Sequence, residues 1–350
     1  MRQITWLSLA CFAWFAGASV AVAGTIAPVL DVAAVPYLDP TGRASYADFL
    51  LINLPRAFAL ASNGMYGWFG GAGRTEDARA KALQSCRQKG GADCMIYAED
   101  LQVVWRGATP VTLAQPPAML LADRGNDFAL VPDPRFLWQG PGEARGALVW
   151  AHGRFTNRDL RNEQPQEYIR AFNNAGFDVI RFDRAPFTDY TNAAADFLRE
   201  GLAKLRQTGW RMVIVAGQSR GAWNGLQMLD TPGLTDAVIA VSPADFGFAA
   251  GQQSAEQEAS LYRVVHAAHS PGTRVAVVQF IGDGYVQDVA ERTATLNDLA
   301  PPRVAAAMLI LRPEGITGHG GGDTASFALR YGHCLLRFVT DPVPPENCGP

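Results

Sequence analysis

The sequence lacks any concentration of positive charge. Its 30 Lys and Arg residues are nearly balanced by 33 Asp and Glu residues, which gives a formal net charge of −3. No basic patch and no alternation of basic with aromatic residues is present, so nucleic acid is not expected as a partner.

Patterns that bind metals or nucleotides are also missing. The chain has five cysteines and five histidines, and none of them forms a CxxC, a zinc-finger spacing or an HExxH motif. The glycine-rich stretch at residues 70–73 does not complete a GxGxxG fingerprint. We therefore expect neither a metal ion nor another cofactor.

A long apolar run occurs once, at residues 4–17, directly after a short segment with Arg2. Small residues at Ala21 and Ala23 fit a cleavage before Gly24, so residues 1–23 are predicted to be a signal peptide. The alternative is an uncleaved anchor, because the run is nearly long enough to span a bilayer. No second run of this length follows, so we expect an exported protein, periplasmic or secreted, with no stable membrane insertion after cleavage.

Cleavage would leave four cysteines, and an even number in an exported chain indicates disulfides. Three pairings are open. The simplest joins Cys86 to Cys94 and Cys334 to Cys348, because each bond then closes a short loop.

From Gly146 onward, short apolar segments alternate with helical patterns. The predicted strands are 147–152, 177–183, 212–216, 237–242, 275–281 and 305–311. The predicted helices are 164–175, 192–207, 222–230, 255–269, 287–299 and 324–338. This alternation predicts an α/β domain over residues 146–340 with a doubly wound, mostly parallel sheet, whose ligands bind at the carboxyl ends of the strands.

The remaining segments differ in composition. Residues 24–110 are predicted to form a small α+β domain with a strand at 57–61, a loop at 62–73, a helix from 75 and a strand from 94 to 105. Residues 111–145 are rich in proline and read as a linker or an arm packed on the larger domain. Residues 341–350 are predicted to be a tail held by Cys348.

A glycine-flanked serine follows the third predicted strand of the large domain. The motif Gly217-Gln218-Ser219-Arg220-Gly221 stands between that strand and a helical pattern, which favours a tight turn that exposes the hydroxyl of Ser219 as a nucleophile. An ordinary strand–helix turn is the alternative.

Partners for this serine follow in the order acid, then histidine. His319 lies in a glycine-rich loop after the last predicted strand, and Asp283 follows the strand before it. Such a carboxylate would orient the imidazole and stabilise its charged form. The weaker alternatives are His333 for the histidine and Asp288, Asp245 and Asp183 for the acid.

An oxyanion needs backbone N–H donors. We expect them at Arg220, directly after the serine, and at Gly153 or Arg154, after the first predicted strand of the domain. His152 and Arg184 follow strand ends and are candidates for contact with the substrate.

Together these motifs resemble the α/β-hydrolase superfamily over about residues 146–340. The resemblance implies an exported serine hydrolase that cleaves a small-molecule carboxylic ester, thioester or amide through an acyl-enzyme. The N-terminal part resembles small exported cysteine-paired modules of uncharacterised families, which implies no activity. The alternative is a non-catalytic binding or scaffold protein on a hydrolase fold, because fold does not fix function.

Overall fold

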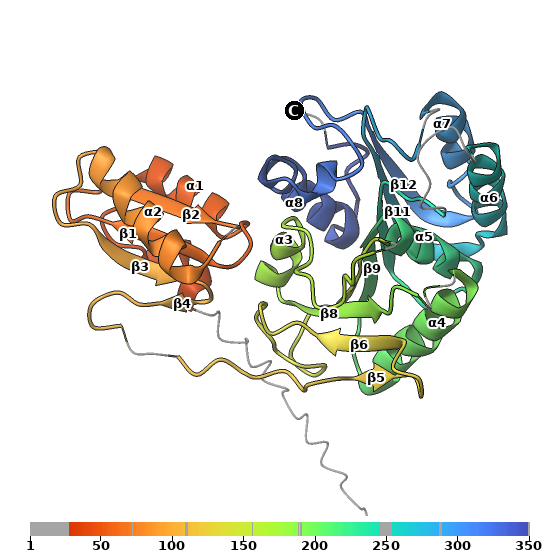
Figure 1. Cartoon of the computed structure of the whole chain (residues 1–350), viewed down its shortest axis with the longest axis horizontal. Helices are drawn as coiled ribbons and strands as arrows, with labels where there is room; N and C mark the ends of the chain where they lie inside the picture. Colours follow the sequence, from red (N-terminus) through yellow and green to blue (C-terminus); the bar gives the residue numbers. More distant parts are fainter. Residues whose placement is uncertain are drawn as a thin grey trace, which may run out of the picture.

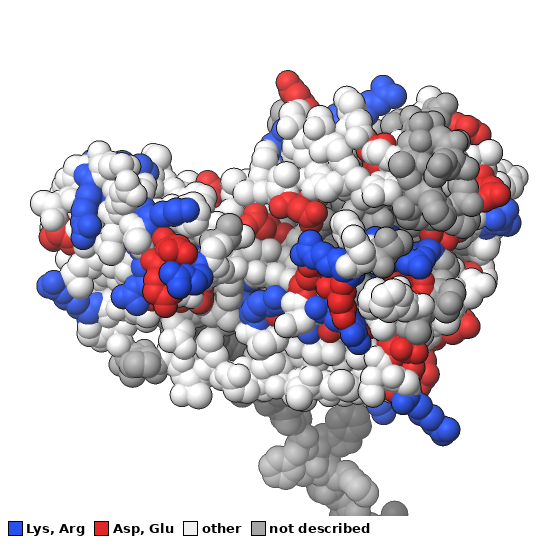
Figure 2. Space-filling view, viewed as in Figure 1, with Lys and Arg blue, Asp and Glu red and all other residues white. Residues whose placement is uncertain are grey.

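The computed structural model of the chain describes residues 28–348 apart from 72, 109–110, 156, 188, 190, 246–253 and 287–288. It has a small N-terminal unit and a larger unit that holds the main sheet (Figure 1). The signal peptide predicted at residues 1–23 lies outside the described residues. No helix in the described part combines the length and apolarity needed to cross a bilayer. Figure 2 shows acidic and basic side chains intermingled on the face in view.

The small unit is a four-stranded antiparallel sheet with a helix on each face. Its strands are β1 (Arg56–Leu60), β2 (Tyr66–Gly70), β3 (Met95–Glu99) and β4 (Gln102–Val103), in the order β2-β1-β3-β4. The helices are α1 (Pro40–Phe49) and α2 (Thr75–Gln88), and the short 3₁₀ turns η1 (Pro28–Leu30) and η2 (Val32–Ala34) precede α1.

The alternation of side chains along β1 explains this arrangement. Phe58 and Leu60 pack in the cluster with Tyr46 of α1. Ala57 and Ala59 face α2 in a second cluster of small residues. These small side chains let α2 lie close to the sheet.

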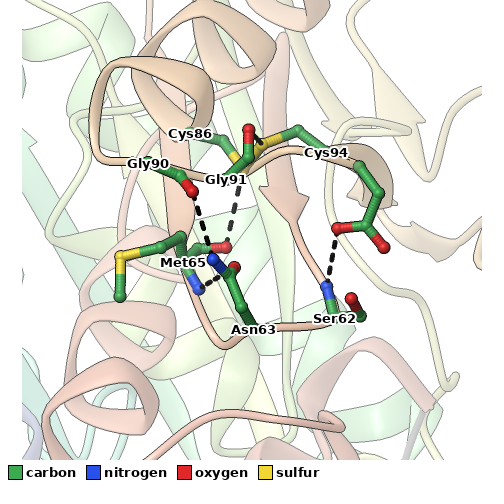
Figure 3. The surroundings of a disulfide bond; sticks show 8 residues. Ser62, Asn63, Met65, Cys86, Gly90, Gly91 and Cys94 are labelled. Carbon is green, nitrogen blue, oxygen red and sulfur yellow. Dashed lines mark hydrogen bonds between the residues drawn. A yellow bond between two sulfur atoms is a disulfide. The ribbon is translucent and has the colours of Figure 1, made fainter.

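The end of α2 is tied to β3 by a disulfide between Cys86 and Cys94 (Figure 3). Near it, the Asn63 side chain donates a hydrogen bond of 3.1 Å to the carbonyl of Gly90. A Cβ atom on Gly91 would collide with the Cys94 sulfur, so glycine is required where the chain passes the bond.

The larger unit is built on an eight-stranded sheet in the order β12-β11-β10-β9-β7-β8-β6-β5. The strands from β7 to β12 pair in parallel, whereas β6 pairs antiparallel with β8 and with β5. The strand bounds are β5 (Leu121–Ala122), β6 (Phe128–Pro132), β7 (Gly146–Ala151), β8 (Phe177–Arg184), β9 (Val213–Gln218), β10 (Ala237–Val241), β11 (Ser270–Gln279) and β12 (Val304–Leu311). The predicted fold class, a doubly wound and mostly parallel α/β sheet with a small α+β unit before it, is confirmed.

Helices cover both faces of this sheet, because successive side chains of its buried strands point to opposite sides. In β7, Leu148 and Trp150 pack on the side of α3 and α8, whereas Val149 packs on the side of α4. Figure 1 shows the same division, with α4 to α7 opposite α3 and α8. The helix bounds are α3 (Ile169–Asn174), α4 (Thr191–Thr208), α5 (Arg220–Gln227), α6 (Ser254–Ala267), α7 (Val289–Asn297) and α8 (Ala325–Thr340), with 3₁₀ turns η3 (Met228–Asp230) and η4 (Gly321–Asp323).

Of the two interpretations of the proline-rich segment 111–145, the arm agrees better with the structure, because the segment contributes β5 and β6 to the main sheet. Three other local predictions were wrong in detail. The predicted loop at 62–73 contains β2, and the predicted strand at 94–105 is a hairpin of β3 and β4 that turns at Asp100, whose φ is 52°. The helix predicted at 164–175 begins only at Ile169.

The C-terminal tail is fastened to α8. A disulfide joins Cys334 to Cys348, the second of the pairings favoured by the sequence. Arg274 of β11 donates hydrogen bonds to the carbonyls of Phe338, Val339 and Asp341, at the end of α8. A cation at this position satisfies carbonyls that a helix end leaves without partners.

The two units meet through buried polar contacts around Asn53. Its side chain donates a hydrogen bond of 2.7 Å to the carbonyl of Pro165 and accepts one of 3.0 Å from Nε of Arg170. The backbone of Leu54 exchanges two hydrogen bonds, of 3.0 and 2.8 Å, with the side-chain amide of Gln164. The irregular segment before α3 therefore forms the edge on which the small unit docks.

Candidate active site

Ser219 occupies a strained turn between β9 and α5. Its φ of 54° and ψ of −118° lie in a region that non-glycine residues rarely adopt. Its backbone N–H donates to the carbonyl of Val241 in β10 at 2.9 Å, and its carbonyl accepts from Ala244 at 3.2 Å. These two bonds, to the last residue of β10 and to the loop that follows it, hold the serine at the carboxyl end of the sheet.

The two glycines of the motif are required by close backbone approaches. A Cβ atom on Gly217 would lie 2.5 Å from the carbonyl carbon of Gly221. A Cβ atom on Gly221 would overlap the carbonyl oxygen of Ala151 in β7. The turn therefore fits only because neither position carries a side chain.

Asp283 and His319 lie in hydrogen-bond contact. Nδ1 of His319 is 2.9 Å from each carboxylate oxygen of Asp283. The Asp283 side chain is 3 % exposed and that of His319 is 18 % exposed, so the acid is shielded while the ring reaches solvent. Donation from Nδ1 to the carboxylate leaves Nε2 as the nitrogen that can accept a proton.

The loop that carries His319 is held beside the serine motif. Nε2 of Gln218, the residue before Ser219, donates to the carbonyl of His319 at 3.2 Å. An isolated parallel bridge between Ile281 and Thr317 joins the loop after β11 to the loop after β12. The structure thus brings the three predicted segments, about a hundred residues apart at most, to one edge of the sheet.

The loop after β7 approaches the same point. A Cβ atom on Gly153 would lie 3.5 Å from Cβ of Ser219 and would collide with the side chain of Gln218. In the described part of the chain, the backbone N–H groups of Gly153 and Arg154 have no hydrogen-bond partner. Gly153 is buried, and buried N–H groups are rarely left without an acceptor.

His152 and Arg184 hold this loop in place through hydrogen bonds. Nε2 of His152 accepts a hydrogen bond of 3.0 Å from the backbone of Arg184, and Nδ1 lies 2.6 Å from the carbonyl of Gly153. Burial, and next the charge of Arg184, lower the pKa of His152 to about 3, so the ring is neutral. Arg184 is 1 % exposed and pairs with Asp189 at 3.1 Å. Both side chains are therefore engaged within the protein, and their predicted contact with substrate stays a prediction.

The weaker candidates for the triad lie elsewhere. Asp245 pairs with Arg220 at 2.8 Å, and Asp183 pairs with Arg181 at 3.0 Å. His333 is exposed on α8. Asp288 lies outside the described residues.

Two further residues at the site were missed by the sequence reasoning. Gln166 donates a hydrogen bond of 2.7 Å to Asp323, which ends the 3₁₀ turn just after His319. Burial raises the pKa of Asp323. The position of Asp323 in the histidine loop was a usable signal, but Gln166 is 157 residues away and carries none.

The sequence matches no protein-family model and no curated protein. Among solved structures, the chain is similar to the esterase Est1E of Butyrivibrio proteoclasticus, with 13 % identity, a TM-score of 0.44, and coverage of 63 % of this chain and 98 % of that one. It is similar to an esterase of Pyrococcus furiosus, with 15 % identity, a TM-score of 0.43, and coverage of 60 % and 86 %. It is also similar to an acylaminoacyl peptidase of Pyrococcus horikoshii, with 10 % identity and a TM-score of 0.41. That similarity covers 62 % of this chain and 40 % of the peptidase.

Proposed function

We propose that the protein is an exported serine hydrolase that cleaves a carboxylic ester, or a thioester or amide, through an acyl-enzyme. The observation that carries the proposal is the Asp283–His319 pair, held by Gln218 beside the strained turn of Ser219. The two disulfides fit an oxidising compartment outside the cytosol.

In this mechanism Nε2 of His319 takes the hydroxyl proton of Ser219 while Oγ attacks the carbonyl carbon. Asp283 keeps the ring in the tautomer that carries hydrogen on Nδ1 and stabilises the imidazolium. The imidazolium then gives its proton to the leaving alcohol, thiol or amine. Water, activated by the same ring, releases the acid and regenerates the serine.

The negative charge on the carbonyl oxygen needs donors placed before the reaction. The backbone N–H groups of Arg220, Gly153 and Arg154 are our candidates, since Arg220 follows the serine and Gly153 faces it. Losing one such donor typically raises the barrier by about 3 kcal/mol, which is roughly a hundredfold in rate.

The direct test is to label the purified, signal-free protein with a fluorophosphonate probe and to measure hydrolysis of a short 4-nitrophenyl ester. We expect the probe to modify Ser219, and Ser219→Ala to lose both labelling and turnover. Ser242→Ala is the matched control, because Ser242 directly follows the adjacent strand β10, is fully buried and has no hydrogen-bond partner for its hydroxyl among the described residues.

Retained turnover in Ser219→Ala would remove the serine from the mechanism. Absence of labelling and of turnover on esters, thioesters and amides in the native protein would favour the alternative, a binding or scaffold protein on this fold.

A further inference from the structure

Arg154 differs from the other arginines around the site because it has no carboxylate partner in the part of the chain that the structure describes. Arg184 pairs with Asp189 and Arg220 with Asp245. Farther along the same loop, the remaining two arginines are also paired, Arg158 with Glu163 and Arg161 with Asp159. Arg154 forms none of these pairs, and its Nε atom is buried without an acceptor.

A buried charged donor without an acceptor is unfavourable, so such groups are usually paired. Arg154 is only partly buried, and its Nε has left water without gaining a hydrogen bond. The arrangement is the one expected of a side chain whose acceptor arrives with a ligand.

The position of Arg154 points to the substrate as that ligand. It follows Gly153, whose α-carbon faces Cβ of Ser219. It also lies with His152, Arg184 and Asp189 at the carboxyl ends of β7 and β8. An anion bound by Arg154 would therefore lie near Ser219 and the reacting carbonyl.

The charged side chains around Arg154 also favour binding of an anion. Burial lowers the pKa of Arg220, the carboxylates of Asp189 and Asp245 oppose this, and the charges of Arg154 and Arg184 lower the pKa further. Arg184 and Arg220 each have a carboxylate partner, Asp189 and Asp245, whereas Arg154 has none among the described residues. Arg154 is therefore the guanidinium group that can take an anion from a ligand.

We propose that Arg154 binds a carboxylate of the substrate, so that the physiological ester carries a negative charge close to the bond that is cleaved. Guanidinium suits this role because its planar fork matches a carboxylate through two parallel hydrogen bonds. The inference rests on the proposed hydrolase function and adds the class of substrate to it.

The test compares matched esters in the full mature chain. With 4-nitrophenyl hemiglutarate and 4-nitrophenyl pentanoate, the acyl groups are of similar length but only the first carries a charge. With 3-carboxyphenyl butyrate and phenyl butyrate, the charge is on the leaving group instead. The readout is the ratio of kcat/KM for the charged ester to kcat/KM for the neutral ester. A general loss of activity lowers both values equally and leaves this ratio unchanged.

We expect the native enzyme to prefer the charged member of at least one pair, and Arg154→Gln to reduce that ratio about 10- to 100-fold, as for a lost hydrogen-bonded charge pair. Arg154→Lys should restore part of it, because an ammonium is a point charge without the fork. Arg161→Gln is the matched control and should keep the ratio, since Arg161 is an exposed arginine farther along the same loop that is paired with Asp159.

Equal ratios in the native enzyme and Arg154→Gln for both pairs would overturn the proposal while leaving the hydrolase function intact. Turnover that persists in Ser219→Ala would overturn the hydrolase function instead. If Arg154→Gln cleaves neither ester, we measure the binding of glutarate monomethyl ester by calorimetry in Ser219→Ala and in the double variant that also carries Arg154→Gln. Equal affinities in the two variants would refute the proposal.

Discussion

Asn53 is the residue whose replacement best tests how the two units are joined. Asn53→Ala removes the hydrogen bond to the carbonyl of Pro165 and the one from the guanidinium of Arg170. Arg170 is fully buried and, among the described residues, would keep hydrogen bonds only to the carbonyl of Arg135 and to Gln164. A neutral hydrogen bond contributes about 1 kcal/mol and one to a charged group about 2 kcal/mol, so we expect a loss of about 3 kcal/mol.

The measurement is urea unfolding of the mature protein, followed by circular dichroism and by tryptophan fluorescence. Asn174→Ala removes one half-buried bond to the carbonyl of Leu50 and should cost about 1 kcal/mol. Asn63→Ala removes two exposed hydrogen bonds in a loop of the small unit, to the carbonyl of Gly90 and from the backbone of Met65, and should cost less still because surface substitutions usually cost little.

The test depends on how the three variants rank by their loss of free energy of unfolding. A loss below about 1 kcal/mol for Asn53→Ala, or a loss no larger than that for Asn63→Ala, would show that the buried contact does not hold the units together. The reasoning from burial and partner count would then be refuted for this interface.

Two further predictions concern the loop after β7. In Gly153→Ala the new methyl group must displace the flexible side chain of Gln218, so the protein should fold with little loss of stability while kcat for esters falls about a hundredfold. In Gly221→Ala the methyl group meets the backbone of Ala151, so this variant should fold poorly. A kcat for Gly153→Ala equal to that of the native enzyme would contradict the assignment of Gly153 to the oxyanion site. Burial lowers the pKa of His152 to about 3, so below pH 6.5 the unfolded chain binds a proton that the folded chain does not. The free energy of unfolding should therefore fall between pH 6.5 and 3, by at most about 1.4 kcal/mol per pH unit from this group. The urea midpoint, measured at pH 7, 6, 5 and 4, should depend less steeply on pH in His152→Gln than in the native protein. Equal slopes in the two proteins would contradict the assignment of this pH dependence to His152.

The elements with strong local signals could be predicted from the sequence. The apolar runs of β7 to β12 had the composition of buried parallel strands, and the glycines around Ser219 predicted the turn between β9 and α5. Asp283 and His319 were chosen as candidates because the chain order of the motifs and the strand ends limited the choice, and the structure places the two side chains in contact. These signals are local, or they follow from the position of a strand in the chain.

The features that the sequence did not predict depend on contacts between distant segments. β5 and β6 join the sheet because β6 pairs with β8, and nothing in the proline-rich segment itself requires that pairing. The segment before α3 has a helical pattern, yet Pro165 disfavours helix in the residue before it and the small unit engages Gln164 in place of a helical turn. The bond between Gln166 and Asp323 likewise arises only from the tertiary fold.

The brevity of β5 has a consequence for how copies of this protein behave when crowded. A sheet whose outermost strand exposes unpaired N–H and C=O groups is a template on which another chain can add. Here the outermost strand on that side is two residues long, and Pro116 and Pro117, which have no N–H to offer, stand shortly before it. That side of the sheet therefore offers little edge on which another chain could pair.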